Sequence, residues 1–294
     1  QRIMIIENCP ICGYGVSLKK HAIKDFSFSK EVFEVVECER CKFLYTNPRP
    51  DSNEIQRYYG SSAYISHTNQ RTGIFGKTYQ HLRKKAIIEK EKWISKHISL
   101  GSILDYGCGT GEFLAYCRTK GWLVTGIEIA EEPRKKAKEN YNLSVLSPDA
   151  LDELEEGQFS AITLWHVLEH VDKLRETLQK IIAKLQSEGL LVVALPNSNS
   201  WDAKHYKEYW AAWDVPIHFY HFKKEDVFTL FSSLGLNHVE TKNMPFDAYY
   251  ISLLSEQNKF GRKNWVKAFL LGFFSNAKAG KNNASSLTYI FKKL

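Results

Sequence analysis

A glycine-rich loop between a short apolar stretch and the start of a helix constrains the fold more than any other feature. Ile103–Tyr106 has the composition of a buried strand, and Gly107, Gly109 and Gly111 follow it at alternate positions. Glycine allows positive φ angles and leaves room for a ligand to approach the backbone. The N-terminus of the following helix adds unpaired N–H groups and a positive dipole end, which suit a carboxylate or a phosphate. The sequence therefore predicts a strand, loop and helix unit that binds a ligand.

The chain from Ser102 onward alternates between apolar strands and amphipathic helices. Strands are predicted at Leu123–Ile127, Ala161–Trp165 and Leu190–Leu195. One helix, which Gly189 is expected to close, is predicted from the helical spacing of Val171, Leu174, Leu178, Ile181 and Leu185. Another helix is predicted near Glu225–Leu234. This alternation predicts an α/β fold with a doubly wound, mostly parallel sheet.

Two shorter regions precede the α/β part, so the chain divides into residues 1–50, 51–100 and 101–294. The first region carries strand-like stretches such as Val32–Glu37 and ends in Asn47-Pro48-Arg49-Pro50. Two prolines in three residues predict an extended connector, because proline fixes its own φ and restricts the residue before it. The second region is predicted to be a helical linker, with one face formed by Tyr79, Leu82, Ala86, Trp93 and Ile94.

Four of the six cysteines form two CxxC pairs, Cys9 with Cys12 and Cys38 with Cys41. Four thiolates at this spacing predict a structural zinc site in the first region. The 25 residues between the pairs exceed the usual ribbon spacing, so a long hairpin or loop is expected there. A metal-free reduced module and a redox pair are the alternatives. Paired cysteines of this kind are typical of a reducing compartment, which predicts a cytoplasmic protein.

Two acids near the glycine loop discriminate between ligands. Glu128 ends the second strand, seventeen positions past Gly111, where a carboxylate can accept hydrogen bonds from both hydroxyls of a ribose. A dinucleotide fingerprint has the spacing GxGxxG, whereas this loop is GxGxG and has Asp105 two residues upstream. Asp105 is a poor neighbour for a pyrophosphate and a good one for a cationic α-amino group. S-adenosylmethionine, which has an amino group, a carboxylate, a ribose and an adenine, suits both acids.

From about Tyr79 to the C-terminus the sequence resembles the class I S-adenosylmethionine-dependent methyltransferases. Asp105 and the three glycines match the first motif of that family, and Glu128 matches its ribose-binding acid. Asp149-Ala150 resembles the pair that contacts the adenine, and Trp165–His170 resembles the fourth motif. The resemblance implies a seven-stranded sheet and S-adenosylhomocysteine as product. It also implies a set of cofactor-binding residues: Tyr64, Asp105, Tyr106, Gly107, Cys108, Gly109, Gly111, Glu128, Ile129, Asp149, Ala150, Trp165 and His166.

The cysteine pairs extend the resemblance to methyltransferases that have an N-terminal zinc-binding module and act in small-molecule and sugar-modifying pathways. Deoxysugar C-methyltransferases of this kind have an extra C-terminal domain that a chain of 294 residues is too short to hold. Their substrate therefore does not transfer to this chain. Tyr64-Ile65-Ser66-His67 resembles a segment that folds over the cofactor in such enzymes, and helix packing is the alternative role for Tyr64.

Methyl transfer from a sulfonium is an in-line displacement, so alignment of the acceptor is the main catalytic requirement. An oxygen or carbon acceptor also gains from a general base, and histidine suits neutral pH. The candidate catalytic residues are therefore His218, His221 and His166. Packing against neighbouring aromatic rings is the alternative for the first two, and lining the cofactor site is the alternative for His166. His170 is expected to cap or orient the helix that follows it.

Positive charge is concentrated at the C-terminus, where residues 256–294 hold eight Lys or Arg and one acid, while the first 255 residues are neutral. Nucleic-acid binders usually spread basic charge over a face or groove, so nucleic acid is not the favoured partner. A basic aromatic helix at Asn264–Phe274 could contact an anionic membrane. The favoured alternative is a last helix that covers the sheet, followed by an edge strand at Ser286–Phe291. No spanning helix is predicted, and the first residues lack the layout of a signal peptide.

Three functions fit these features to different degrees. Methylation of a small molecule is preferred, with a sugar or a nucleotide-linked sugar as candidate acceptors. An RNA-directed methyltransferase that grips RNA with its cysteine module is the second, although no Asn/Asp-Pro-Pro-Tyr type motif follows the fourth strand. A binding module without chemistry is the third, and the intact glycine loop argues against it.

The aromatic segment Trp201–Trp213 predicts either a wall for the acceptor or packing. The sequence does not indicate the methylated atom or the oligomeric state.

Overall fold

The computed structural model describes residues 3–51, 53–59, 74–280 and 282–294. Within these residues the main sheet has seven strands in the order β12-β13-β10-β9-β6-β7-β8. Their bounds are β6 Ser102–Tyr106, β7 Leu123–Ile127, β8 Val145–Leu146, β9 Phe159–Trp165, β10 Leu185–Pro196, β12 Leu236–Asn243 and β13 Ser286–Lys293. The pairs among β6 to β10 are parallel, and β13 runs antiparallel to both of its neighbours. The predicted doubly wound, mostly parallel sheet is confirmed.

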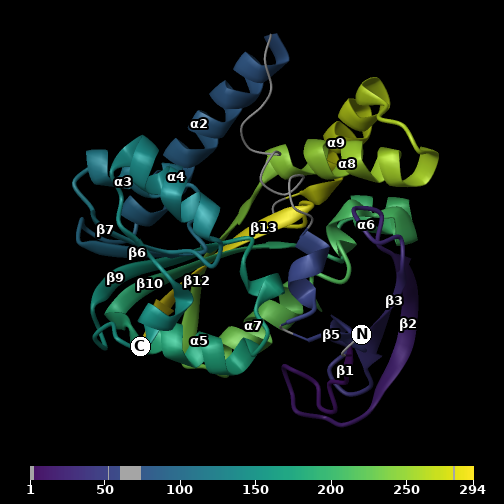
Figure 1. The fold of residues 1–294 in the computed structure, drawn as a ribbon, viewed down its shortest axis with the longest axis horizontal. Helices are drawn as coiled ribbons and strands as arrows, with labels where there is room; N and C mark the ends of the chain where they lie inside the picture. Colours follow the sequence, from purple (N-terminus) through teal and green to yellow (C-terminus); the bar gives the residue numbers. More distant parts are fainter. Residues whose placement is uncertain (1–2, 52, 60–73, 281) are drawn as a thin grey trace.

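Helices cover both faces of this sheet (Figure 1). On one face lie α2 Ile74–Ser95, α3 Glu112–Thr119 and α4 Glu131–Tyr141, and on the other lie α5 Leu174–Ala183 and α7 Lys224–Ser232. The central strands are almost continuously apolar because both of their faces are covered, and Leu104, Ile162 and Val193 are fully buried. Short 3-10 turns connect these elements: η1 Ile55–Tyr59, η2 Pro148–Leu151 and η3 Leu168–His170.

Two predictions about the sheet were wrong. The helix α5 ends at Ala183 and β10 begins at Leu185, so Gly189 lies inside a strand instead of closing a helix. The pairing of β10 with β9 shifts register between Leu185 and Leu190, an irregularity of the kind that a glycine accommodates. The strand β13 is not at the edge, because β12 pairs along its outer side. The polar sequence of β12 carries no apolar run that would have indicated a strand.

A smaller sheet contains most of the first fifty residues. Its order is β11-β4-β3-β2, formed by β2 Ser17–Lys24, β3 Val32–Cys38, β4 Leu44–Thr46 and β11 Tyr220–His221. The strand β11 comes from the α/β part of the chain, so the two parts share a sheet. A two-stranded pair, β1 Ile3–Met4 with β5 Arg49–Pro50, lies in the same region. The predicted proline connector is extended but not exposed, because Arg49 is buried over the ring of Phe219 and pairs with Asp172 at 2.6 Å.

The aromatic segment after β10 packs between the two parts of the molecule. It forms α6 Trp201–Tyr206 and the turns η4 Lys207–Tyr209 and η5 Ala211–Trp213. Tyr206, Trp210 and Trp213 are buried in one cluster with Ile23 and Val35 of the smaller sheet. This arrangement matches the packing alternative for these side chains. The remaining helices, α8 Pro245–Phe260 and α9 Trp265–Ala279, lie beyond this segment (Figure 1).

Candidate functional site

The glycine loop lies at the carboxyl ends of β6 and β7, and its three glycines have different roles. All three have positive φ angles, between 54° and 80°. A Cβ on Gly107 would lie 2.3 Å from Val167, and one on Gly111 would lie 2.8 Å from Leu143. A Cβ on Gly109 would meet no atom of the described residues within 4 Å. Packing therefore explains two of the glycines, and only Gly109 presents bare backbone to open space.

Glu128 stands beside that open position. The Gly109 N–H donates to one carboxylate oxygen of Glu128 at 2.9 Å, and the Ala130 N–H donates to the other at 3.0 Å. Each carboxylate oxygen has two lone pairs, so one on each oxygen remains for a ligand hydroxyl. The next residue, Ile129, has an exposed apolar side chain two positions past the end of β7. The loop therefore offers a fixed bidentate acceptor next to an apolar surface.

Asp105 lies buried at the end of β6, where the Thr163 hydroxyl donates to it at 2.6 Å. Burial raises the pKa of Asp105 to about 7, although the Thr163 hydrogen bond and the charge of Lys90 act in the opposite direction. The Lys90 ammonium on α2 lies 4.1 Å from the centre of the Trp165 ring, and burial lowers its pKa. The indole N–H of Trp165 is buried without a hydrogen-bond partner among the described residues. Such an orphaned donor and a buried acid suit a zwitterionic ligand.

His166 follows β9 and lies between two carboxylates. Its Nε2 is 3.0 Å from Asp247 on α8, and its Nδ1 is 3.4 Å from Glu169. Burial alone would lower the pKa of His166, but the two carboxylates outweigh it and raise the pKa to about 9. Its φ of 58° is unusual for a residue with a side chain, and such strain is typical of functional sites. These contacts make His166 a cation at neutral pH, with no free lone pair for a base.

A second pair of imidazoles lies next to Glu169. The rings of His170 and His218 meet edge to face with centres 4.6 Å apart. Each Nδ1 donates to a backbone carbonyl, of Ile217 at 3.0 Å and of Ala212 at 2.9 Å, so each Nε2 keeps its lone pair. Burial and the neighbouring His218 lower the pKa of His170 to about 4, and burial also lowers the pKa of His218.

Glu169 completes this cluster. One nitrogen or oxygen atom each of Glu169, His170 and His218 lies within 4.8 Å of the others. Burial acts to raise the pKa of Glu169, but the positive charge of His166, 3.4 Å away, outweighs it and holds the pKa below its usual range. Two neutral imidazoles beside an ionised carboxylate can accept a proton, and the same set could hold a divalent cation.

The structure places the other predicted site residues as follows. Tyr106 and Cys108 are half-buried at the loop, and η2 carries an exposed Asp149 and a half-buried Ala150. Tyr64 lies outside the described residues. His221 does not join the Glu169 cluster: its Nε2 is 3.0 Å from the Thr46 hydroxyl, and its ring packs against Trp213.

Sequence reasoning missed four residues of this site: Lys90, Thr163, Glu169 and Asp247. Thr163 lies in the predicted strand Ala161–Trp165, and Glu169 lies in the stretch that resembles the fourth motif. Their closeness in sequence to predicted site residues could have identified them. Lys90 and Asp247 come from α2 and α8, and no local pattern distinguishes them from other charged residues on helices.

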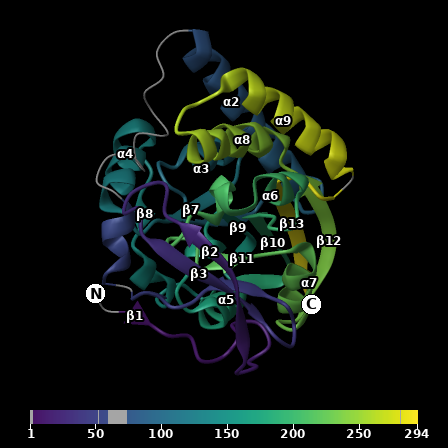
Figure 2. The same ribbon diagram turned by 90° about the vertical axis from the view of Figure 1, so that its right-hand side faces the viewer.

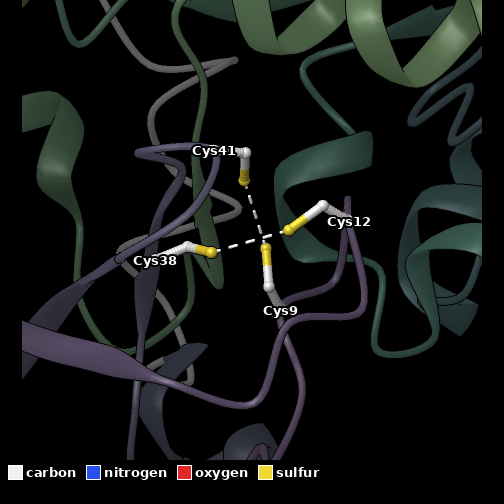
Figure 3. Close-up of side chains that lie close together, drawn as sticks. All are labelled: Cys9, Cys12, Cys38 and Cys41. Carbon is white, nitrogen blue, oxygen red and sulfur yellow. Dashed lines mark hydrogen bonds between the residues drawn. The ribbon is translucent and has the colours of Figure 1, made fainter.

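The four cysteines of the CxxC pairs converge on one point (Figure 3). The Sγ atoms of Cys9 and Cys41 are 3.5 Å apart, and those of Cys12 and Cys38 are 3.6 Å apart. A tetrahedron with Zn–S bonds of about 2.3 Å has S···S edges of about 3.8 Å. A disulfide would require about 2.05 Å. The spacing of the four sulfurs therefore fits zinc and excludes disulfide pairs.

Both CxxC turns have the same backbone geometry. The N–H of Gly13 donates to the carbonyl of Cys9 at 2.9 Å, and the N–H of Lys42 donates to the carbonyl of Cys38 at 2.9 Å. Gly13 and Lys42 also share positive φ angles of 70° and 62°. Two equivalent turns therefore direct the four thiols toward one another.

Comparison with known proteins gives a consistent family. A family model described as a methyltransferase domain matches residues 79–241, just over half of the chain. The ubiquinone biosynthesis O-methyltransferase of Rickettsia typhi is 27% identical over 135 residues, which cover 43% of this chain and 54% of that protein. The enzyme of the same name from Dechloromonas aromatica is 29% identical over 116 residues, covering 36% and 50%.

The chain thus spans about half the length of the curated relatives it matches. Among solved structures, the geranyl diphosphate C-methyltransferase of Streptomyces coelicolor superposes with a TM-score of 0.53 at 12% identity, covering 77% of this chain and 88% of that one. At this identity the superposition shows the fold alone. The fold, the glycine loop and the family match agree, and this chain belongs to the methyltransferase domain family.

Proposed function

We propose that this protein transfers the methyl group of S-adenosylmethionine to a small-molecule acceptor. The observation that carries the proposal is the backbone of Gly109, which is open among the described residues and donates to Glu128, in the loop that follows Asp105 and β6. Glu128 would accept hydrogen bonds from the ribose hydroxyls, and Asp105 would face the amino group. The exposed Ile129 would pack against the adenine, whose edge would reach Asp149-Ala150. When bound, the sulfonium supplies an activated methyl group, and the chain supplies alignment and a base.

Binding of S-adenosylhomocysteine is expected to tighten as pH rises toward 7. Burial holds the pKa of Asp105 at about 7 in the free protein, and a cationic amino group beside it would favour the carboxylate. Binding below pH 7 must therefore release a proton, which makes the affinity about tenfold weaker at pH 5.5 than at pH 7. Calorimetry in two buffers of different ionisation enthalpy measures both the affinity and the released proton. An affinity that stays constant from pH 5.5 to 7.5, or that varies equally in Asp105→Asn, would contradict the assignment.

We assign the general base to His218. Its Nδ1 is committed to the Ala212 carbonyl, so its Nε2 lone pair can take the proton of an acceptor hydroxyl. Glu169 and Asp214, whose Oδ2 is 4.0 Å from that Nε2, would stabilise the imidazolium that forms. His166 is a positioning residue in this scheme, because its positive charge keeps the buried Glu169 ionised. The relatives named O-methyltransferases support an oxygen acceptor, with phenols, sugars and nucleotide-linked sugars as the classes to test.

Replacing His218 with glutamine is expected to lower kcat by about 10² to 10⁴-fold, the usual contribution of a general base, with little change in the affinity for S-adenosylhomocysteine. The measurement is transfer of radiolabelled methyl to phenols, nucleotide sugars and RNA. The matched control is His238→Gln, because His238 is also a hydrogen-bonded histidine of lowered pKa but lies on β12. Unchanged turnover in His218→Gln would refute the base, and transfer to RNA alone would refute the small-molecule acceptor.

We also propose that Cys9, Cys12, Cys38 and Cys41 hold a structural zinc ion. The support is the tetrahedral spacing of the sulfurs and the two equivalent turns. Four thiolate ligands would saturate zinc, so the ion would stabilise the fold and take no part in methyl transfer. The buried Cys9 and Cys38 lie within the main core cluster, which includes residues of the large sheet. Zinc at this position would therefore hold the smaller sheet against the rest of the molecule.

A further inference from the structure

The helix α9 has its large side chains on the outside. Its buried positions are the small residues Ala268, Gly272, Ser275 and Ala279, which face the rest of the protein. A Cβ on Gly272 would lie 2.9 Å from the Cα of Tyr249, so α9 packs closely on α8 through this small side. Figure 2 shows α9 on the outside of α8, away from the main sheet. The prediction that the last helix covers the sheet was therefore wrong.

The opposite side of α9 is an exposed apolar surface. It consists of five side chains that are between 50% and 74% exposed, here called the α9 outer face: Val266, Phe269, Leu270, Phe273 and Phe274. These residues recur at helical spacing and form a continuous stripe. An apolar stripe of this size on a described helix is unusual for a surface that faces only water, and such patches mark interaction sites.

Both ends of α9 are basic. Arg262 and Lys263 just before the helix and Lys278 in its last turn are exposed, and α9 itself carries no acid. Lys267 lies on the same helix, but it is paired with the buried Glu256 at 3.1 Å. Three exposed cations thus flank the aromatic and aliphatic stripe at its two ends, so an occupant of this face must be apolar in the middle and anionic at its edge.

We propose that the α9 outer face docks on the surface of an anionic lipid bilayer. Aromatic and leucine side chains of an interfacial helix enter the boundary between headgroups and acyl chains, while lysines contact anionic headgroups. A second copy of the chain is disfavoured as occupant, because a two-fold contact pairs a surface with itself and would bring the cations of one copy against those of the other. None of the described helices is long and apolar enough to cross a bilayer, so the proposed contact lies at the surface.

The docking face and the candidate active site share the helix α8. Asp247, which pairs with His166, lies in the first turn of α8, next to the exposed Phe246. The helix α9 packs on α8 through Gly272 and Tyr249, two residues further along. The helix α8 would therefore connect the bilayer-facing helix α9 with Asp247 of the candidate site. The docking proposal stands on the α9 surface alone and does not depend on the proposed methyl transfer.

The experiment is co-sedimentation of the full chain with vesicles of phosphatidylcholine containing 30% phosphatidylglycerol, compared with phosphatidylcholine alone. We expect binding to the anionic vesicles at low salt, weakened about tenfold without the anionic lipid or in 0.5 M NaCl. The variant Leu270→Gln/Phe273→Gln is expected to lose about tenfold or more of the binding. Its matched control, Phe28→Gln/Val32→Gln, replaces two side chains that are 52% and 62% exposed, one in the turn between β2 and β3 and one at the start of β3, and it is expected to bind like the natural chain.

Circular dichroism and thermal unfolding are expected to show that both double variants are folded, because all four positions are exposed. Absence of binding to anionic vesicles at low salt would overturn the proposal. Equal loss in both double variants, or equal binding to both vesicle types, would also overturn it. A dimer in sedimentation velocity that Leu270→Gln/Phe273→Gln dissociates would instead assign the face to a second copy.

Discussion

Replacing Gly109 with alanine is expected to weaken binding of S-adenosylhomocysteine at least about 100-fold, which corresponds to about 2.8 kcal/mol at 1.4 kcal/mol per tenfold. Among the residues that the structure describes, the Cβ would meet no atom within 4 Å, so it would project into the space that the ligand is proposed to fill next to Glu128. The positive φ of 54° adds strain of about 1 kcal/mol to the folded protein. Calorimetry with S-adenosylhomocysteine measures the affinity, and thermal unfolding measures the strain.

Gly157→Ala is the matched control for this change. Gly157 also has a positive φ, 64°, and a Cβ there would also meet nothing within 4 Å in the described part of the chain, but it lies in the turn before β9. Both alanine variants should therefore lose similar stability, and only Gly109→Ala should lose cofactor affinity. If the two variants bind S-adenosylhomocysteine equally well, the open position at Gly109 does not face the cofactor.

Replacing Cys38 with alanine is expected to remove the bound zinc and to lower the free energy of unfolding by at least about 4 kcal/mol. Three thiols cannot complete a closed tetrahedral site, and the two CxxC turns would lose the ion that joins them. Elemental analysis gives the zinc content per chain, with one equivalent expected for the natural chain. Urea unfolding gives the free energy.

Cys117→Ala separates the loss of zinc from the loss of a buried side chain. Cys38 and Cys117 are both fully buried, but Cys117 lies on α3 and takes no part in the cysteine cluster. We expect Cys117→Ala to keep one zinc per chain and to lose only about 1 kcal/mol, as is usual for a core substitution. A natural chain that binds no zinc when purified under reducing conditions would refute the metal site, and equal destabilisation by the two variants would refute its structural role.

The parts of the fold that could be predicted are those encoded over short distances along the chain. The predicted strand Leu123–Ile127 has the bounds of β7, and Ala161–Trp165 differs from β9 only at its start. The predictions of secondary structure were wrong where a tertiary contact overrides the local sequence pattern. Leu185 continues the helical spacing of α5, yet it pairs with Phe159 as the first residue of β10. The sheet strand β12 was missed because its side chains are mostly polar.

The candidate site likewise contains residues that the local sequence predicts and features that depend on tertiary contacts. Asp105, Gly109 and Glu128 belong to one strand, loop, helix and strand unit, so their relation follows from the local pattern. Which glycine opens to the ligand depends on Val167 and Leu143, which come from later segments.

The Glu169 cluster and the carboxylate that pairs with His166 beside it consist of side chains from distant parts of the chain. Glu169 and His170 come from the turn after β9, His218 from the loop before β11 and Asp247 from α8. The pKa shifts of these groups arise from burial and from the charges of their neighbours. Both causes appear only when the segments pack together in the folded protein.

For the helix α9, the sequence likewise predicts the composition, and tertiary packing decides which side is exposed. The composition of residues 264–279 shows an apolar, aromatic and basic helix, because those properties belong to the residues themselves. Only the packing of Gly272 on Tyr249 turns its small side inward and leaves the phenylalanines outside. Identity and spacing along the chain indicate the secondary structure, the ligand-binding loop and the cysteine site. Long-range packing selects which chemical groups share a pocket and which face water, because burial and distance are properties of the assembled fold.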